Sequence, residues 1–191
     1  TWLYDTRGRL ISESKTLTGA GTFNTSWTYN HADMPISMTY PDNETVTYGY
    51  NSRMLLESVI GSNAYVSSTL YDSAGRMTQR ALGNGLTQTY TYYNWNEQVN
   101  SIGQGGRLKN ITIGSLQNLN YLYDAVGNIK QIANPLASET NTYDYDALNR
   151  LTSWNLNGAV ENYAYDPATG NLAMKGSLTL QYNDAAHAHA V

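Results

Sequence analysis

The residues His187 and His189, with Asp184 close by, have the types and spacing that could bind a metal ion. On an extended chain, residues two apart lie on the same face, and imidazole and carboxylate groups are ligands that zinc accepts. A polar tail explains the same residues without a metal, so we expect neither a metal nor a cofactor. The third histidine, His31, lies in a turn motif and is expected to face solvent.

Aspartates that recur along the chain are the second set of candidate chemical groups. A calcium site needs several oxygen ligands converging in one loop, but each of these short segments offers a single carboxylate. Asn replaces Asp in four of nine copies, which a catalytic acid or base would not tolerate. Turn capping accounts for both residue types, because either side chain accepts hydrogen bonds from backbone N–H groups.

Other kinds of chemistry have little support in the sequence. The chain has no cysteine, no Gly-x-Ser-x-Gly nucleophile motif and no phosphate-binding glycine loop. Its net charge of -4 and the lack of a Lys/Arg cluster argue against nucleic-acid binding. No segment approaches the roughly 18 apolar residues that span a bilayer. We therefore expect a protein that is not an enzyme, with no nucleic-acid partner and no membrane span.

A tyrosine-led motif recurs through the whole chain. Nine motif tyrosines, each leading a turn segment that starts with Asp or Asn, stand 17 to 30 residues apart, which is typical of a repeat protein. The clearest copies provide the residues that we expect to form the structural repeat motif: Tyr4, Asp5, Gly8, Tyr71, Asp72, Gly75, Tyr123, Asp124, Gly127, Tyr145, Asp146, Asn149, Tyr165, Asp166 and Gly170. The weaker copies begin at Tyr29, Tyr50, Tyr93 and Tyr182.

Each copy predicts a hairpin. Asp or Asn opens a type I turn, and the residue three positions later takes a left-handed conformation that favours Gly, or Asn as at position 149. Met54, Glu97 and Ala186 fit that position poorly. The opposite ends of the hairpins are predicted at Asn84-Gly85 and Asn157-Gly158, and less sharply at 41–43 and 103–106.

Aromatic side chains precede most of these turns. The motif tyrosine usually has an aromatic residue two positions earlier, on the same face of the strand. Cross-strand aromatic pairing explains this pattern, and a carbohydrate-binding platform is the alternative. Trp95 and Trp154 fall outside the pair positions and are the candidates for ligand contact. Because 17 of the 22 aromatic residues are tyrosines, we expect rings with one polar, hydrogen-bonded end.

Nine repeats of two strands predict an all-β fold with about 18 strands. Open sheets rarely exceed about 10 strands without curling, so we expect tandem β-hairpins in a curled antiparallel sheet. We treat residues 1–191 as one β-sheet segment, with an irregular insert at about 100–118 and loss of the repeat from Asn183 to Val191. The chain begins inside a repeat, which indicates a piece of a longer protein.

The recurring Tyr-Asp-x-x-Gly-Arg/Asn-Leu, the stretch at 82–92 and the closing His-Ala-His-Ala-Val at 187–191 resemble the YD-repeat (Rhs-repeat) family. That family includes bacterial Rhs polymorphic toxins, Tc insecticidal toxin components and teneurins. Its repeats wind into a spiral β-sheet forming a hollow shell around a toxin domain. The self-cleavage motif that often precedes the toxin in this family, Asp-Pro-x-Gly-Leu, is missing here.

The resemblance implies a section of shell wall in an exported bacterial protein, secreted or at the cell surface, whose partners are its own parent chain and an enclosed toxin or effector. The alternative is a carbohydrate- or protein-binding module for surface adhesion. Open sheet edges should also favour self-association.

Overall fold

The computed structural model describes residues 1–184 and 186–189; residues 185, 190 and 191 lie outside the described part. Within the described residues there are nineteen strands and no helix, which confirms the all-β prediction. Accordingly, no helix there is long and apolar enough to cross a membrane. The predicted loss of the repeat from Asn183 onward falls partly on the undescribed positions, and the described residues of that segment contain no strand. The chain forms two compact units, Thr1–Thr89 and Tyr90–Val191, and each is treated by itself.

Unit 1 (Thr1–Thr89) is a succession of hairpins in which each strand pairs antiparallel with the next. Its strands are β1 (Trp2–Tyr4), β2 (Leu10–Leu17), β3 (Gly21–Tyr29), β4 (Pro35–Thr39), β5 (Thr45–Tyr50), β6 (Leu56–Ile60), β7 (Ala64–Tyr71), β8 (Met77–Leu82) and β9 (Thr87–Tyr92), the last of which continues past the end of the unit. Tyr-Asp or Tyr-Asn turns join β1 to β2, β3 to β4, β5 to β6 and β7 to β8.

The two faces of the unit 1 sheet differ in chemistry. One face, here the aromatic face of unit 1, carries the cross-strand rows Trp27–Met38–Val46 and Tyr48–Val59–Val66. The other face carries Ser and Thr rows, with hydroxyl hydrogen bonds between Thr39 and Thr45 (2.9 Å) and between Thr16 and Thr22 (2.9 Å). The alternation of strand residues thus sorts apolar and aromatic side chains from small hydroxyls.

Unit 2 (Tyr90–Val191) continues the same construction, again with antiparallel neighbours. Its strands are β10 (Gln98–Val99), β11 (Ile102–Gly103), β12 (Leu108–Ile113), β13 (Gln117–Tyr123), β14 (Ile129–Asn134), β15 (Glu139–Tyr145), β16 (Leu151–Leu156), β17 (Ala159–Tyr165), β18 (Leu172–Lys175) and β19 (Leu178–Thr179). Strands β10 and β11 form a separate short hairpin, just ahead of most of the residues that we expected to be an insert.

Trp154 corrects one sequence-based prediction. We placed it outside the aromatic pairs, but it lies directly opposite Tyr143 on the neighbouring strand. Its indole Nε1 donates a hydrogen bond to Asn141 Oδ1 at 2.8 Å. The ring is therefore part of a cross-strand aromatic pair, of the kind that stabilises antiparallel sheets.

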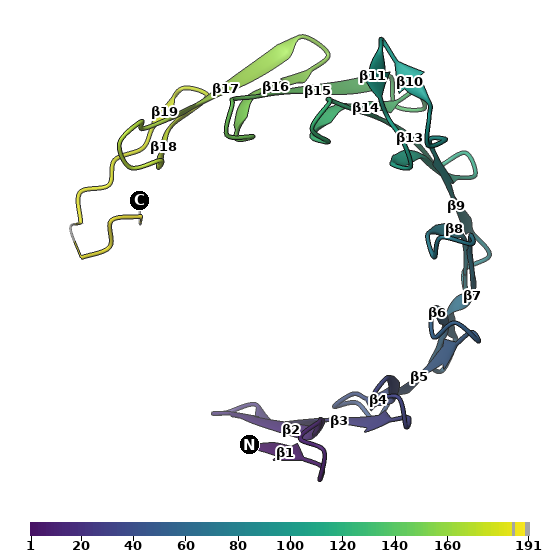
Figure 1. Cartoon of the computed structure of the whole chain (residues 1–191). Helices are drawn as coiled ribbons and strands as arrows, with labels where there is room; N and C mark the ends of the chain where they lie inside the picture. Colours follow the sequence, from purple (N-terminus) through teal and green to yellow (C-terminus); the bar gives the residue numbers. More distant parts are fainter. Residues whose placement is uncertain (185, 190–191) are drawn as a thin grey trace. The chain divides into compact units, whose positions relative to one another are not determined.

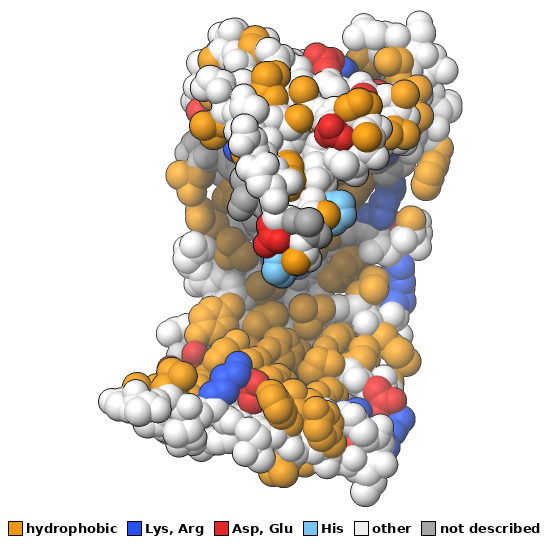
Figure 2. All heavy atoms as spheres, turned by 90° about the vertical axis from the view of Figure 1, so that its left-hand side faces the viewer, with side chains coloured by type: hydrophobic (Ala, Val, Ile, Leu, Met, Phe, Trp, Pro, Cys, Tyr) orange, Lys and Arg blue, Asp and Glu red, His pale blue; other side chains and the backbone are white. Residues whose placement is uncertain are grey.

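Both units are one layer thick, which leaves almost no sealed core. Among the described residues only Val46 and Tyr93 are buried hydrophobic residues, at 3% and 5% exposure. Within each unit the sheet bends along the strand order instead of lying flat (Figure 1). In a view turned by 90°, hydrophobic side chains gather over the strands of unit 1, in the lower part of the picture (Figure 2). The order of such a sheet depends on local turns and on contacts between neighbouring repeats.

Candidate functional site

The repeat turn is the element that recurs with the most constant geometry. In the first copy Asp5 Oδ1 accepts the backbone N–H groups of Arg7 (2.9 Å) and Arg9 (3.0 Å). The backbone closes through Gly8 N to Asp5 O and Asp5 N to Arg9 O, both at 3.0 Å. This is the hydrogen-bond pattern of a type I turn followed by a bulge. Asn30 and Asn51 accept backbone N–H groups in the same way, so Asn serves as well as Asp.

The fourth residue of these turns has a positive φ. The glycines at this position are Gly8, Gly75 and Gly127, with φ between +78° and +103°, and Gly170 has φ +76° as the fifth residue of a turn that is one residue longer. Asn149 occupies it at +61°, as expected of the residue type that best tolerates the region after Gly. Met54 also takes +61° although its side chain suits the position poorly, because Asn51 still caps the turn.

In three turns the aspartate forms an ion pair with an arginine four residues later. Arg9, Arg76 and Arg150 each donate from Nε, at 2.7 Å, to the second carboxylate oxygen of the turn aspartate. The backbone N–H of Arg150, and then its guanidinium, donate hydrogen bonds to Asp146 that lower the pKa of that carboxyl. The corresponding bonds from Arg9 and Arg76 lower the pKa of Asp5 and of Asp72. Both oxygens of these carboxylates are therefore occupied by donors of the same chain, which suits capping and not proton transfer.

The motif tyrosines bind the previous repeat. In six copies the hydroxyl donates to the backbone carbonyl of the first residue of the strand that follows the preceding turn, at 2.5–3.0 Å. We call these bonds tyrosine latches, and the pairs are Tyr29–Leu10, Tyr50–Pro35, Tyr71–Leu56, Tyr145–Ile129, Tyr165–Leu151 and Tyr182–Leu172. All but the last of these pairs join directly paired, neighbouring strands, and each latch connects one Tyr-Asp or Tyr-Asn turn to the repeat before it.

Cations of the turns add a second link between repeats. The Arg9 guanidinium carbon lies 4.8 Å from the ring centre of Tyr29, and that of Arg150 lies 4.2 Å from the ring centre of Tyr165. These distances are within the range of a cation–π contact. The same arginine thus closes its own turn and packs on the tyrosine that latches the next repeat.

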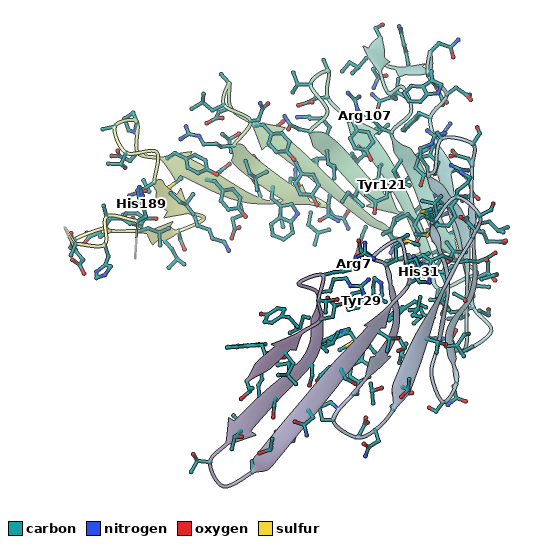
Figure 3. The ribbon with its side chains drawn as sticks, turned by 60° about the horizontal axis from the view of Figure 1, so that its bottom comes forward. Arg7, Tyr29, His31, Arg107, Tyr121 and His189 are labelled. Atoms are coloured by element: carbon teal, nitrogen blue, oxygen red, sulfur yellow. The ribbon has the colours of Figure 1, made fainter. Side chains whose placement is uncertain are left out.

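Turns also contact their neighbours directly. Arg7 donates to His31 O at 3.3 Å and pairs with Asp33 at 2.6 Å, so the first turn holds the second (Figure 3). His31 is exposed, as the sequence predicts. In unit 2, Asn128 donates from Nδ2 to Asn149 Oδ1 at 2.9 Å and links two turns in the same manner.

Gln104 has a structural role that its sequence context does not indicate. We expected residues 103–106 to form a simple turn, but the Gln104 side chain is only 1% exposed. Its Nε2 donates to Tyr123 O and its Oε1 accepts from Tyr123 N, both at 3.0 Å. The Gln104 side-chain amide thus makes the two hydrogen bonds to the Tyr123 backbone that a neighbouring strand would otherwise make. At this interruption Tyr93 also departs from the latch pattern and donates to Tyr121 O at 2.7 Å (Tyr121 is labelled in Figure 3).

The two C-terminal histidines have separate partners. His187 Nδ1 lies 2.7 Å from Asp184 Oδ2, whereas His189 Nδ1 lies 2.6 Å from Asn171 Oδ1. In the described part of the chain no group of three His, Cys, Asp or Glu residues is arranged to hold a metal ion.

Comparison with known proteins gives one family. Residues 4–45 match the family model described as RHS Repeat. The toxin subunit YenC1 of Yersinia entomophaga is 33% identical over 103 residues, which are 47% of this chain and 10% of that protein.

Solved structures give the same fold. The crystal structure of TcdB2–TccC3 matches with a TM-score of 0.68 and 20% identity, over 89% of this chain and 11% of the other. The Photorhabdus luminescens Tc holotoxin pore matches with a TM-score of 0.65 and 20% identity, over 87% of this chain and 10% of the other. The chain spans about a tenth of the length of these proteins. Residues 4–45 thus match an RHS repeat, and the nine motif copies and the hairpin sheet make the rest of the chain similar to the YD-repeat (Rhs-repeat) family.

Proposed function

We propose that this chain is a non-enzymatic section of wall in the shell of an exported toxin protein, and that the shell encloses a toxin or effector domain of the same assembly. The observation that carries the proposal is the single layer of the sheet. Each unit joins hairpin to hairpin through latches and exposes an aromatic-rich face, with no second layer packed on it among the described residues. A sheet of that kind is better suited to separating two spaces than to forming a compact core.

The turn chemistry supports a mechanical role. The carboxylates of Asp5, Asp72 and Asp146 are held by backbone N–H groups and arginines, and their pKa values are lowered by those bonds. They remain ionised and bonded at neutral pH. The likeness to YenC1, a toxin subunit, and to Tc toxin structures supports a place in a secreted toxin complex.

Limited proteolysis of the complete gene product tests the proposal. We expect the region after the repeats to resist trypsin in the intact protein and to be degraded when it is expressed alone. Variants with several latch tyrosines changed to Phe should make that region sensitive. Equal sensitivity of the region in the intact and isolated forms would refute enclosure. Saturable binding of the chain to glycans, together with an accessible downstream region, would favour the adhesion alternative.

A further inference from the structure

A cleft of about 590 Å³ lies entirely within unit 1, at the edge opposite the Tyr-Asp turns. It is formed by the β4–β5 turn, strands β5 and β6 and the start of β7. Its lining residues are Tyr40, Pro41, Asp42, Glu44, Val46, Tyr48, Val59 and Tyr65. Val46, Tyr48 and Val59 belong to the aromatic face of unit 1, so the cleft has an apolar base with tyrosines and carboxylates around it.

The acidic side of this cleft is built before any ligand arrives. Glu44 Oε1 accepts the Tyr65 hydroxyl (2.6 Å), the Ser62 backbone N–H (3.1 Å) and the Ser62 hydroxyl (2.9 Å). A side chain on Gly61 would meet Glu44 Oε1 at 2.5 Å and the Tyr65 ring at 2.8 Å, so glycine makes room for both groups. The hydrogen bond from Tyr65 lowers the pKa of Glu44, which keeps that carboxylate charged at neutral pH.

Asp42 is fixed by its own turn. One carboxylate oxygen accepts the backbone N–H of Glu44 at 3.0 Å, and Asn43 closes the turn at φ +69°. The lining therefore contains two carboxylates and no lysine or arginine. Three tyrosines stand with them: Tyr48 is half-buried, whereas Tyr40 and Tyr65 keep 38% and 47% of their surface exposed.

We propose that this cleft binds an organic cation, an alkylammonium or guanidinium group that carries apolar substituents. Aromatic ring faces attract such cations, and a carboxylate beside the rings supplies the counter-charge. The apolar base accommodates the alkyl part of the ligand. Sugars also stack on tyrosine rings and donate hydroxyl hydrogen bonds to carboxylates, but only a cation is in addition attracted by both negative charges. The group can come from a free amine or from a lysine or arginine side chain of a polypeptide.

Titration followed by amide NMR of the full chain distinguishes these ligands. The probes are choline, N-acetyl-lysine methylamide and N-acetyl-arginine methylamide, with dimethylbutanol as the neutral isostere of choline and methyl glucoside as the sugar. We expect saturable shifts at β5 and β7 with at least one cation, and binding of dimethylbutanol about tenfold weaker than choline. Selectivity for the amino-acid derivatives over choline would identify a polypeptide as the source. Equal affinity for choline and its neutral isostere, or saturation by the glucoside alone, would overturn the proposal.

Charge-neutralising variants provide the second arm. The double substitution Asp42→Asn with Glu44→Gln retains the oxygens that accept the turn and Tyr65 hydrogen bonds but removes both charges. We expect it to weaken cation binding about tenfold while the remaining spectrum stays unchanged. The control is Glu57→Gln, which removes an exposed carboxylate of β6 outside the cleft. Equal losses in the variant and the control would show only a general effect of charge and refute the site.

Discussion

The tyrosine latch provides the most informative test of how the repeats hold together. In Tyr145→Phe the ring remains and only the hydroxyl that donates to Ile129 O at 2.9 Å is lost. The lost bond contributes about 0.5–1.5 kcal/mol, and a buried carbonyl left without its donor costs about 1–3 kcal/mol. Because water can reach part of this site, we expect the free energy of unfolding of unit 2 to fall by about 1–2 kcal/mol. Urea unfolding of the full chain measures this loss, and amide hydrogen exchange in β14 and β15 locates it.

Tyr163→Phe is the matched control for this experiment. Tyr163 lies on the neighbouring strand β17, and its hydroxyl binds the carboxylate of Glu161 in the same strand, not the previous repeat. That bond raises the pKa of Tyr163 to about 12, so the hydroxyl has a strong partner. Because that bond stays within one strand, we expect Tyr163→Phe to leave exchange in β14 unchanged, whatever it costs in overall stability. If the two variants behave alike, the latch does not join the repeats.

Three further predictions concern the turns and the interruption. Gly127→Val should lower the free energy of unfolding in urea by about 1–3 kcal/mol, because Gly127 has φ +103°. The control Gly103→Val, at a glycine with open space around it and no positive φ, should lower it far less, and similar losses in the two variants would refute the turn assignment. Bonds to Arg150 lower the pKa of Asp146 in the folded state, so the ionised carboxylate stabilises the fold above about pH 4 and loses this contribution as the pH falls. The difference in unfolding free energy between wild type and Asp146→Asn should therefore shrink from pH 7 to pH 3. A difference that stays constant with pH would contradict this role of Asp146. Gln104→Leu leaves the backbone N–H and C=O of Tyr123 without their hydrogen bonds and should lower the free energy of unfolding, measured thermally, by about 2–4 kcal/mol. The control Gln98→Leu, at an exposed glutamine, should change it little.

The turns and the all-β class could be predicted from sequence because they depend on local chemistry. Asp5 followed by Gly8 specifies the cap and the left-handed residue within four positions. Asn157 and Gly158, with φ of +49° and +99°, form the two-residue turn that their types favour. Asn84-Gly85 forms a different turn, in which only Gly85 has a positive φ, because Leu82 closes the hairpin on Leu86.

Contacts between repeats were harder to predict, since they depend on register. The latch from Tyr71 to Leu56 joins residues on different hairpins, and no local pattern identifies a backbone carbonyl as the acceptor. One signal was present: 17 of the 22 aromatic residues are tyrosines, which indicates rings with a hydrogen-bonded hydroxyl. Gln104 gave no comparable signal, because a single polar residue between glycines is typical of an exposed loop.

The contacts of the turn arginines lie between these extremes. Arg150, four residues after Asp146, could be expected to contact that carboxylate, and it does at 2.7 Å. Its second contact, over the ring of Tyr165, requires the hairpin to return beside the turn, which only the pairing of β16 with β17 establishes.

Cryo-electron microscopy of the complete gene product tests the wall hypothesis most directly. We predict that residues 4–183 will form a curved single-layer sheet with the latches of Tyr145 and Tyr165 in place, and that density for another part of the protein will lie on the inner side of that sheet. A map in which this segment encloses nothing and the downstream region is an exposed, separate domain would contradict the account.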